Sequence, residues 1–171
     1  LTTCIDRVSR ELRELPDSPF HEAIAMRITN PRAEVAAHFD AFFEKEASRF
    51  PIKASYTEIN GFDINTDLWY FDVFAYSSYG GLEDFDWISD WQSDDFPHMP
   101  ITGFERLQEV FASDAFGDDR FTDACDLAGL IFVLRFQELV AESSREMKQL
   151  SFPLLATAHD YDFIYQATTN A

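Results

Sequence analysis

The chain has 171 residues, of which 46% are hydrophobic and 16% aromatic, and its 31 acidic against 13 basic residues give a formal net charge of −18 at pH 7. This length and apolar content predict one globular domain over residues 1–171 with a sizeable core, unlike the composition of disordered acidic chains. A field this negative repels phosphate backbones and anionic membrane surfaces. It therefore disfavours nucleic acid and membranes as direct partners and favours a basic protein.

Three elements are predicted in the first 50 residues. Residues 3–15 carry an apolar stripe of helical period, and the proline that follows ends this helix. The run 20–29 alternates in a way that favours a half-buried strand. Asn30 is expected to cap a helix that has Pro31 as its first residue and ends before residue 51. The buried face of this helix is predicted to consist of Val35, Phe39, Phe42, Phe43 and Phe50.

The middle of the chain changes to strand periodicity. Residues 52–56 and the aromatic run 68–76 are predicted to pair as an antiparallel hairpin, with turn residues between them. On the second strand, one face is wholly apolar and is predicted to face the core: Trp69, Phe71, Val73 and Ala75. The opposite face is mixed and carries Tyr70, Asp72, Phe74 and Tyr76. The segment 85–91 is also predicted to be a strand.

The C-terminal half is predicted to be mainly helical. Thr102 and Glu105 have capping-box spacing and are expected to open a helix. A long helix from residue 121 to about 147 is apolar nearly all round, so we expect it to be buried on most of its circumference. Residues 154–168 return to strand character, with a tight turn at 159–162. The fold class predicted is α+β, a mostly antiparallel sheet of about four to five strands covered by about four helices.

Acidity is concentrated in one part of the sequence. Residues 54–105 contain no Lys or Arg, eleven carboxylates and all three tryptophans, and they hold −11 of the total charge of −18. The other 119 residues hold only −7. Adaptation to high salt would spread acids over the whole surface, so this concentration favours a local function.

Motifs for chemistry are weak throughout the chain. The carboxylates between Asp84 and Asp95 suggest a cation site, but bulky aromatics stand where a calcium loop needs glycine. His159 lies beside Asp160 and Asp162, which is how a general base is often held, yet no nucleophile accompanies it. Phosphate-binding loops and the serine elbow are absent from the sequence. The sequence therefore assigns no catalytic residue, no metal ligand and no cofactor.

The two cysteines and the first residues bear on the compartment. Cys4 and Cys125 are too far apart in sequence for a metal or redox pair, and both are predicted to be small buried side chains in a reducing environment. Residues 1–15 have no long apolar run, so neither a signal peptide nor a membrane span is expected. A cytoplasmic location is predicted.

The function expected from the sequence is binding of a basic protein. Carboxylates attract Lys and Arg, while Trp and Tyr bury large areas at low entropic cost. The expected binding residues are Glu83, Asp84, Asp86, Trp87, Asp90, Trp91, Asp94 and Asp95. An inhibitor or bacterial immunity protein that neutralises a basic, nucleic-acid-attacking toxin would have these properties. The alternatives are a metal-dependent enzyme using residues 84–95 and His159, and a structural or oligomerisation domain of unassigned oligomeric state.

Overall fold

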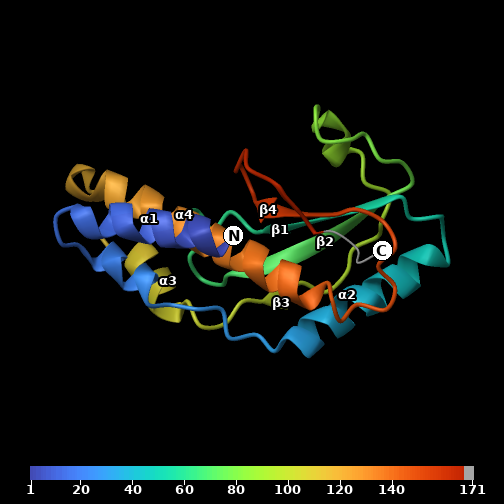
Figure 1. Cartoon of the computed structure of the whole chain (residues 1–171), viewed down its shortest axis with the longest axis horizontal. Helices are drawn as coiled ribbons and strands as arrows, with labels where there is room; N and C mark the ends of the chain where they lie inside the picture. The colour runs from blue at the N-terminus through green and yellow to red at the C-terminus, as the bar shows by residue number, and fades with distance from the viewer. Residues whose placement is uncertain (168–171) are drawn as a thin grey trace.

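A five-stranded sheet lies at the centre of the computed structural model, which describes residues 1–167 (Figure 1). The strand order is β3-β2-β1-β4-β5. The strands are β1 (Ala54–Ile59), β2 (Tyr70–Tyr76), β3 (Met99–Pro100), β4 (Leu154–Ala158) and β5 (Tyr165–Ala167). Neighbouring strands are antiparallel except for β1 and β4, which are parallel. The predicted α+β class with a mostly antiparallel sheet is confirmed.

Four α-helices accompany the sheet in the described residues. They are α1 (Thr2–Glu14), α2 (Arg32–Ala47), α3 (Glu105–Phe111) and α4 (Thr122–Ser143). The long helix α4 is buried along most of its length, because its apolar residues occupy nearly every side and α1, α2 and the sheet all pack on it. The predicted long buried helix is thus confirmed, although it ends four residues before residue 147. Residue 168 of the predicted C-terminal hairpin lies outside the described part of the chain.

The two faces of the sheet have different surroundings. The inner face, to which β2 contributes Phe71, Val73 and Ala75, packs against α2 and α4: the ring of Phe71 lies 5.7 Å from that of Phe39 and 5.2 Å from that of Phe136. The alternation along β2 points Tyr70, Asp72, Phe74 and Tyr76 to the opposite side, which we call the outer face. Strand β1 adds Tyr56 and Glu58 to that face. The predicted division of β2 into a core face and a mixed face is confirmed.

The core is unusually aromatic around one tryptophan. The Trp69 ring stacks on Phe132 of α4 with 4.5 Å between centroids, and the rings of Phe62 and Phe111 meet its edge at 5.5 and 5.6 Å. Its indole nitrogen donates a hydrogen bond of 2.9 Å to the carbonyl oxygen of Phe62, so the one polar atom of this buried side chain is satisfied. Trp69 is therefore structural, as its place on the core face predicted.

The predicted strand 20–29 is wrong. Residues Pro19–Ile24 form a 3₁₀ helix, and Ser18 with His21 makes a reciprocal capping arrangement at its start. Within this helix Phe20 and Ala23 turn into the core one helical turn apart. The alternation that suggested a strand, Ile24, Met26 and Ile28, is half-buried as predicted, but the chain there pairs with no strand of the described sheet. Phe20 is fully buried against Phe111, with ring centroids 5.5 Å apart.

Two predicted helix caps are also wrong. The side chain of Asn30 does not cap α2; its amide nitrogen donates to the Pro100 carbonyl, and its oxygen accepts from the Thr102 amide, both at 2.9 Å. The Thr102 and Glu105 box does not form, because Glu105 accepts from the Gly103 amide instead. Asn30 thus joins its own turn to a turn some 70 residues away, whereas Glu105 bonds within its own turn.

The cysteines differ in exposure. Cys125 on α4 is half-buried, whereas Cys4 on α1 is exposed, so the prediction that both are buried is wrong for Cys4. Cys4 lies one position before Ile5, which belongs to the apolar stripe that α1 turns toward the core. One residue turns the helix by about 100°, so Cys4 points away from this stripe. Within residues 1–167, the structure contains no helix long and apolar enough to cross a membrane.

Candidate functional site

A segment that we call the cover segment, residues 80–96, packs Phe85, Trp87 and Ile88 on the outer face of the sheet (Figure 1). Its last residue, Phe96, lies against Phe42 of α2. The strand predicted within it is wrong: Asp86–Ser89 form a 3₁₀ helix. The Asp84 carboxylate accepts from the Asp86 amide at 2.9 Å, and Ser89 Oγ donates to the Asp86 carbonyl. These short-range bonds favour a turn over a strand.

Trp87 anchors the first half of the cover segment. Its indole packs edge-on against Tyr76 and Tyr79, with centroids 4.8 and 5.5 Å apart, and its nitrogen donates to the Gly81 carbonyl at 3.2 Å. A Cβ at Gly80 would lie 2.2 Å from the indole ring, so only glycine permits this approach. The Tyr76 hydroxyl donates to the Ile88 carbonyl at 2.8 Å, which fixes the 3₁₀ helix to β2.

The second half of the cover segment is fastened to the end of β2. The backbone amide of Gln92 donates to the carbonyl of Ala75, and the amide of Ala75 donates to Ser93 Oγ, both at 3.1 Å. The Gln92 side chain accepts from the amide of Ser77 at 2.7 Å.

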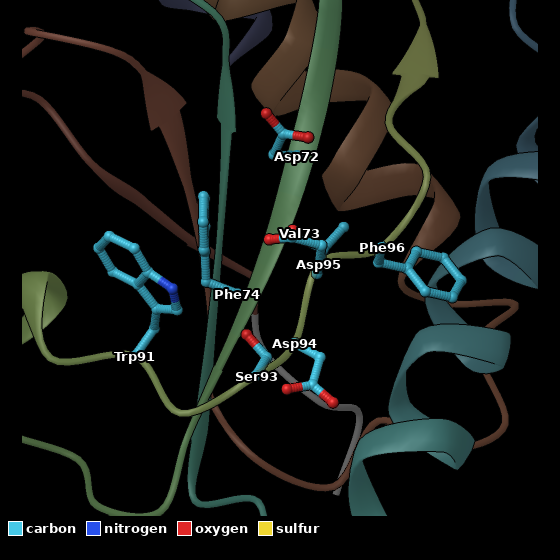
Figure 2. A pocket seen from close by; sticks show the side chains of 8 residues that line it. All are labelled: Asp72, Val73, Phe74, Trp91, Ser93, Asp94, Asp95 and Phe96. Atoms are coloured by element: carbon cyan, nitrogen blue, oxygen red, sulfur yellow. The ribbon is translucent and has the colours of Figure 1, made fainter.

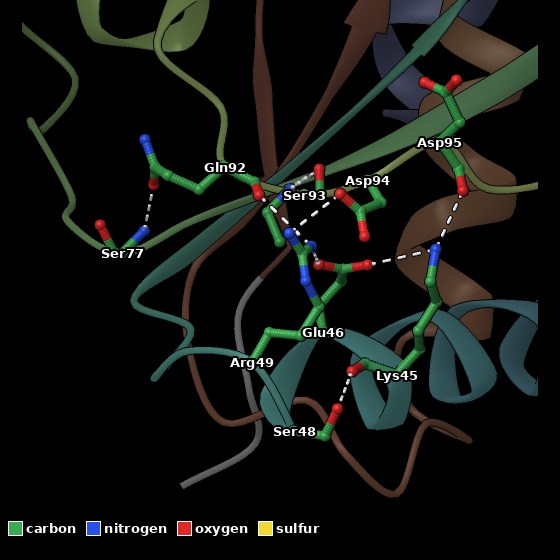
Figure 3. A network of polar contacts seen from close by, with 10 residues as sticks. Lys45, Glu46, Ser48, Arg49, Ser77, Gln92, Ser93, Asp94 and Asp95 are labelled. Carbon is green, nitrogen blue, oxygen red and sulfur yellow. Dashed lines mark hydrogen bonds and ion pairs between the residues drawn. The ribbon is translucent and has the colours of Figure 1, made fainter.

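Basic side chains at the C-terminal end of α2 and just beyond it hold the same part of the cover segment (Figure 3). Arg49 pairs with Asp94 at 2.9 Å and with the buried carboxylate of Glu46, while Lys45 Nζ donates to the Asp95 carbonyl at 2.9 Å. Residues 92–95 are therefore held from two sides, by β2 and by α2.

Phe74 and Trp91 divide the outer face into two hollows. Their rings lie 5.2 Å apart, and each lines both hollows. The first, which we call the acidic hollow, measures about 240 Å³ and carries Asp72, Asp94 and Asp95 (Figure 2). The second, the aromatic hollow, measures about 450 Å³ and lies between the outer face and the 3₁₀ helix Asp86–Ser89.

A hydrogen-bonded carboxylate forms the polar end of the aromatic hollow. Glu58 Oε2 accepts from the Tyr56 hydroxyl at 2.6 Å, and Glu58 Oε1 lies 3.3 Å from Nδ1 of His159. Burial, followed by the nearby Glu58 charge and this hydrogen bond, raises the pKa of Tyr56 well above its usual value. Tyr56 therefore remains a proton donor and holds Glu58 in place.

Asp72 lies on the same face, next to Glu58 on the neighbouring strand. Burial raises the pKa of Asp72, and the charges of Glu58 and Asp95 raise it further, whereas His98 acts in the opposite direction. His98 stacks on Tyr70 with 4.3 Å between ring centroids. In the described residues, no Lys or Arg forms an ion pair with Glu58 or Asp72.

The predicted binding residues reach the surface, though not as one cluster. The exposed carboxylates are Glu83, Asp84, Asp86, Asp90, Asp94 and Asp95. Trp91 is 51% exposed, and Trp87 is half-buried as the anchor of the cover segment. Within residues 1–167, no three His, Cys, Asp or Glu side chains are grouped so that they could hold a metal ion.

Sequence reasoning did not select Tyr56, Glu58 or Asp72 as site residues. A signal was present, because a charged residue within an aromatic strand marks a face that is not core. His159 was considered together with Asp160 and Asp162, but the carboxylate that approaches its Nδ1 is Glu58 of β1, 101 positions away. Only the parallel pairing of β1 with β4 brings these two residues together.

Comparisons of the chain with protein-family models, with curated proteins and with solved structures found no match in any of the three.

Proposed function

We propose that this chain binds a basic protein through the cover segment and the outer face beneath it. The observation that carries the proposal is that six carboxylates of the cover segment are exposed together with the half-exposed Trp91, within a stretch of sequence, residues 54–105, that contains no Lys or Arg. Carboxylates in this setting attract a basic partner over distance, and an exposed tryptophan supplies an anchor once contact is made.

Neutralisation of a toxin that attacks nucleic acid is the role we propose for this binding. Such a protein holds its negatively charged substrate in a basic groove, and an acidic, aromatic surface is complementary to that groove. The cover segment is fixed by Trp87 at one end and by Arg49 at the other, so little ordering entropy is lost when a partner binds.

The test is retention of basic proteins from the native lysate on the immobilised chain. Retention should be strong at low ionic strength and should weaken at about 0.15 M and above, where the screening length is about 8 Å. In a test variant, Glu83→Gln, Asp84→Asn, Asp86→Asn and Asp90→Asn remove four charges but keep acceptor oxygens. We expect this variant to lose the retained proteins. A retained nuclease should also lose activity when mixed with an equimolar amount of the chain.

The control variant changes the net charge by the same amount elsewhere. Glu14→Gln, Asp17→Asn, Glu44→Gln and Asp114→Asn alter four exposed carboxylates that form no ion pair in the described residues. It should retain the same proteins as the unaltered chain. Equal losses from both variants would show that only net charge matters and would overturn the proposal, as would the absence of any salt-sensitive basic protein.

A further inference from the structure

We infer that the aromatic hollow is a binding site for an arginine side chain of the basic partner, an inference that rests on the proposed function and names its chemistry. The hollow is lined by rings from two elements: Tyr56, Phe74 and Tyr76 of the sheet and Phe85 and Trp91 of the cover segment. Its volume of about 450 Å³ falls within the usual range of about 300–1,000 Å³ for ligand sites.

The charged end of the hollow matches a cation. Glu58 is only 20% exposed, and its side chain is fixed by Tyr56, so its position does not depend on a partner. Each of its two oxygens has one neighbour in the described residues, Tyr56 or His159, and a carboxylate oxygen can accept a second hydrogen bond. Asp86 also lines the hollow and adds a second negative charge. A cation that enters therefore meets a prepared acceptor.

The aromatic walls select arginine over lysine. A guanidinium group is planar, less strongly hydrated than an ammonium, and stacks on ring faces while it donates two parallel hydrogen bonds to a carboxylate. Phe74 and Trp91 provide such faces next to Glu58, and Trp91 is 51% exposed, so the entrance is not closed by the chain itself. An ammonium group would keep more of its water and gain less from these walls.

No Lys or Arg of the described residues lines the aromatic hollow. Residues 54–105 contain none, and Lys45 of α2 and Arg49, two residues beyond the end of α2, are engaged at Asp95 and Asp94 on the other side of the Phe74 and Trp91 rings. The acidic hollow thus already has Lys45 and Arg49 at its edge, whereas the basic group that lines the aromatic hollow in the described residues is His159. The Glu58 carboxylate in the aromatic hollow therefore has no Lys or Arg partner in the described residues, which favours this hollow as the site for a cation of the partner.

The experiment uses the full chain, labelled with ¹⁵N, and three tripeptides: acetyl-Gly-Arg-Gly-amide and its lysine and citrulline counterparts. The three indole N–H resonances report on separate places, since Trp91 lines the hollow, Trp87 anchors the cover segment and Trp69 is buried on the inner face. We expect the arginine peptide to shift Trp91 and leave Trp69 unmoved. The citrulline peptide keeps the shape but not the charge, and should bind about tenfold more weakly or worse.

Two variants locate the binding. Glu58→Gln keeps an acceptor for Tyr56 but removes the charge, and should weaken the arginine peptide about tenfold, while Asp114→Asn should leave it unchanged. Equal Trp91 shifts with the arginine and citrulline peptides would overturn the inference. So would full binding of the arginine peptide by Glu58→Gln, provided that an unmoved Trp69 resonance shows the fold to be intact. Trp91→Ala removes an exposed ring, so it should fold normally. With its binding read from the backbone amides of Asp86 and Ser89, which also line the hollow, this variant should lose the preference for arginine over lysine.

The outcomes separate this inference from the proposed function. Salt-sensitive retention of a basic protein without any Trp91 shift from the arginine peptide would leave the proposed function standing and refute the arginine site. A Trp91 shift that depends on Glu58, with no retained basic protein, would establish the arginine site and refute the proposed function.

Discussion

Glu58 and Asp72 stand directly opposite each other on the antiparallel strands β1 and β2, and both point to the outer face. Like charges in this position repel and destabilise a sheet. No Lys or Arg in the described residues pairs with either one; the charged or titratable neighbours are His98 near Asp72 and His159 near Glu58. The pair therefore lowers the free energy of unfolding of the chain without a partner. Such a loss of stability is common at sites whose charges are arranged for binding.

Replacing Asp72 with Asn is expected to stabilise the chain at pH 7. The gain should be a few tenths of a kcal/mol up to about 1 kcal/mol, because the repulsion from Glu58 and the burial of a charge both disappear. The measurement is the free energy of unfolding from denaturant titrations, with Asp114→Asn as the control for loss of an exposed charge. If the Asp72→Asn variant were less stable than the unaltered chain at pH 7, the account of this pair would be contradicted.

The pH dependence of that gain has a definite sign. The pKa of Asp72 in the folded chain lies above the ordinary value of 3.8, so the folded state binds the proton more tightly than the unfolded state. The contribution of Asp72 to stability is then largest below pH 3.8 and is lost as the pH rises through the folded pKa. The free energies of unfolding of the Asp72→Asn variant and of the unaltered chain should be equal below pH 3.8. The variant should become the more stable of the two as the pH rises through the folded pKa of Asp72.

The hairpin and its two faces could be predicted because period-2 alternation is a local property of the sequence. The placement of Phe71 inward and of Phe74 outward follows from the alternation along β2. The long helix α4 was predictable for a similar reason, since its apolar run exceeds the length of any strand.

The site itself could not be predicted because it depends on contacts distant in sequence. The 3₁₀ helix Asp86–Ser89 is favoured by short side-chain bonds and by the packing of Trp87 on Tyr76, and the aromatic spacing alone favoured a strand. The approach of His159 to Glu58 requires the parallel pairing of β1 and β4, which no local pattern specifies. The exposed carboxylates, in contrast, were predictable from composition.

Arg49→Met is expected to loosen the cover segment as well as lower stability. Arg49 is the cation shared by the buried Glu46 and by Asp94, so its removal leaves Glu46 with only Lys45, whose nitrogen lies 3.4 Å away (Figure 3). The bond from Lys45 to the Asp95 carbonyl is then the remaining polar link between α2 and residues 92–95 in the described structure. We expect a loss of about 1–3 kcal/mol, the cost of leaving a buried polar group poorly satisfied.

Two measurements check the Arg49 prediction. Denaturant unfolding gives the loss of stability, and hydrogen exchange of the Gln92 amide, which is bonded to the Ala75 carbonyl, should become faster. Arg7→Met is the matched control, because Arg7 pairs with Glu11 on the exposed surface of α1 and should contribute nothing measurable. Unchanged exchange at Gln92 would show that Arg49 is not needed to hold this part of the cover segment.

The two cysteines should react at very different rates. Cys4 is exposed, whereas burial, with the charges of Asp126 and Asp63, raises the pKa of Cys125 to about 12. Since the thiolate is the reactive form, a disulfide reagent at pH 8 should modify one thiol per native chain rapidly and the second only after denaturation. Mass spectrometry of the labelled peptides should identify Cys4, and rapid modification of both thiols in the native chain would contradict this assignment.

Gly103→Ala is expected to be far more harmful than Gly117→Ala. Both glycines have left-handed backbones, with φ of +95° and +85°. A Cβ at Gly103 would lie 2.2 Å from the carbonyl oxygen of Arg27, whereas no heavy atom lies within 4 Å of one at Gly117. Gly117→Ala should thus cost only the strain of the backbone, about 1 kcal/mol, and Gly103→Ala should add about 1–3 kcal/mol of overpacking.

The reason lies in how the turn at Gly103 joins the chain. The amide of Thr29 donates to the Thr102 carbonyl at 2.9 Å, so a displaced Arg27 carbonyl would also break this connection between residues 25–30 and the start of α3. Unfolding titrations of the two variants side by side isolate the clash of the new Cβ with the Arg27 carbonyl, because the strain of a positive φ is common to both variants. Equal losses of stability would mean that the Arg27 carbonyl moves aside freely and that the turn is not a fixed junction.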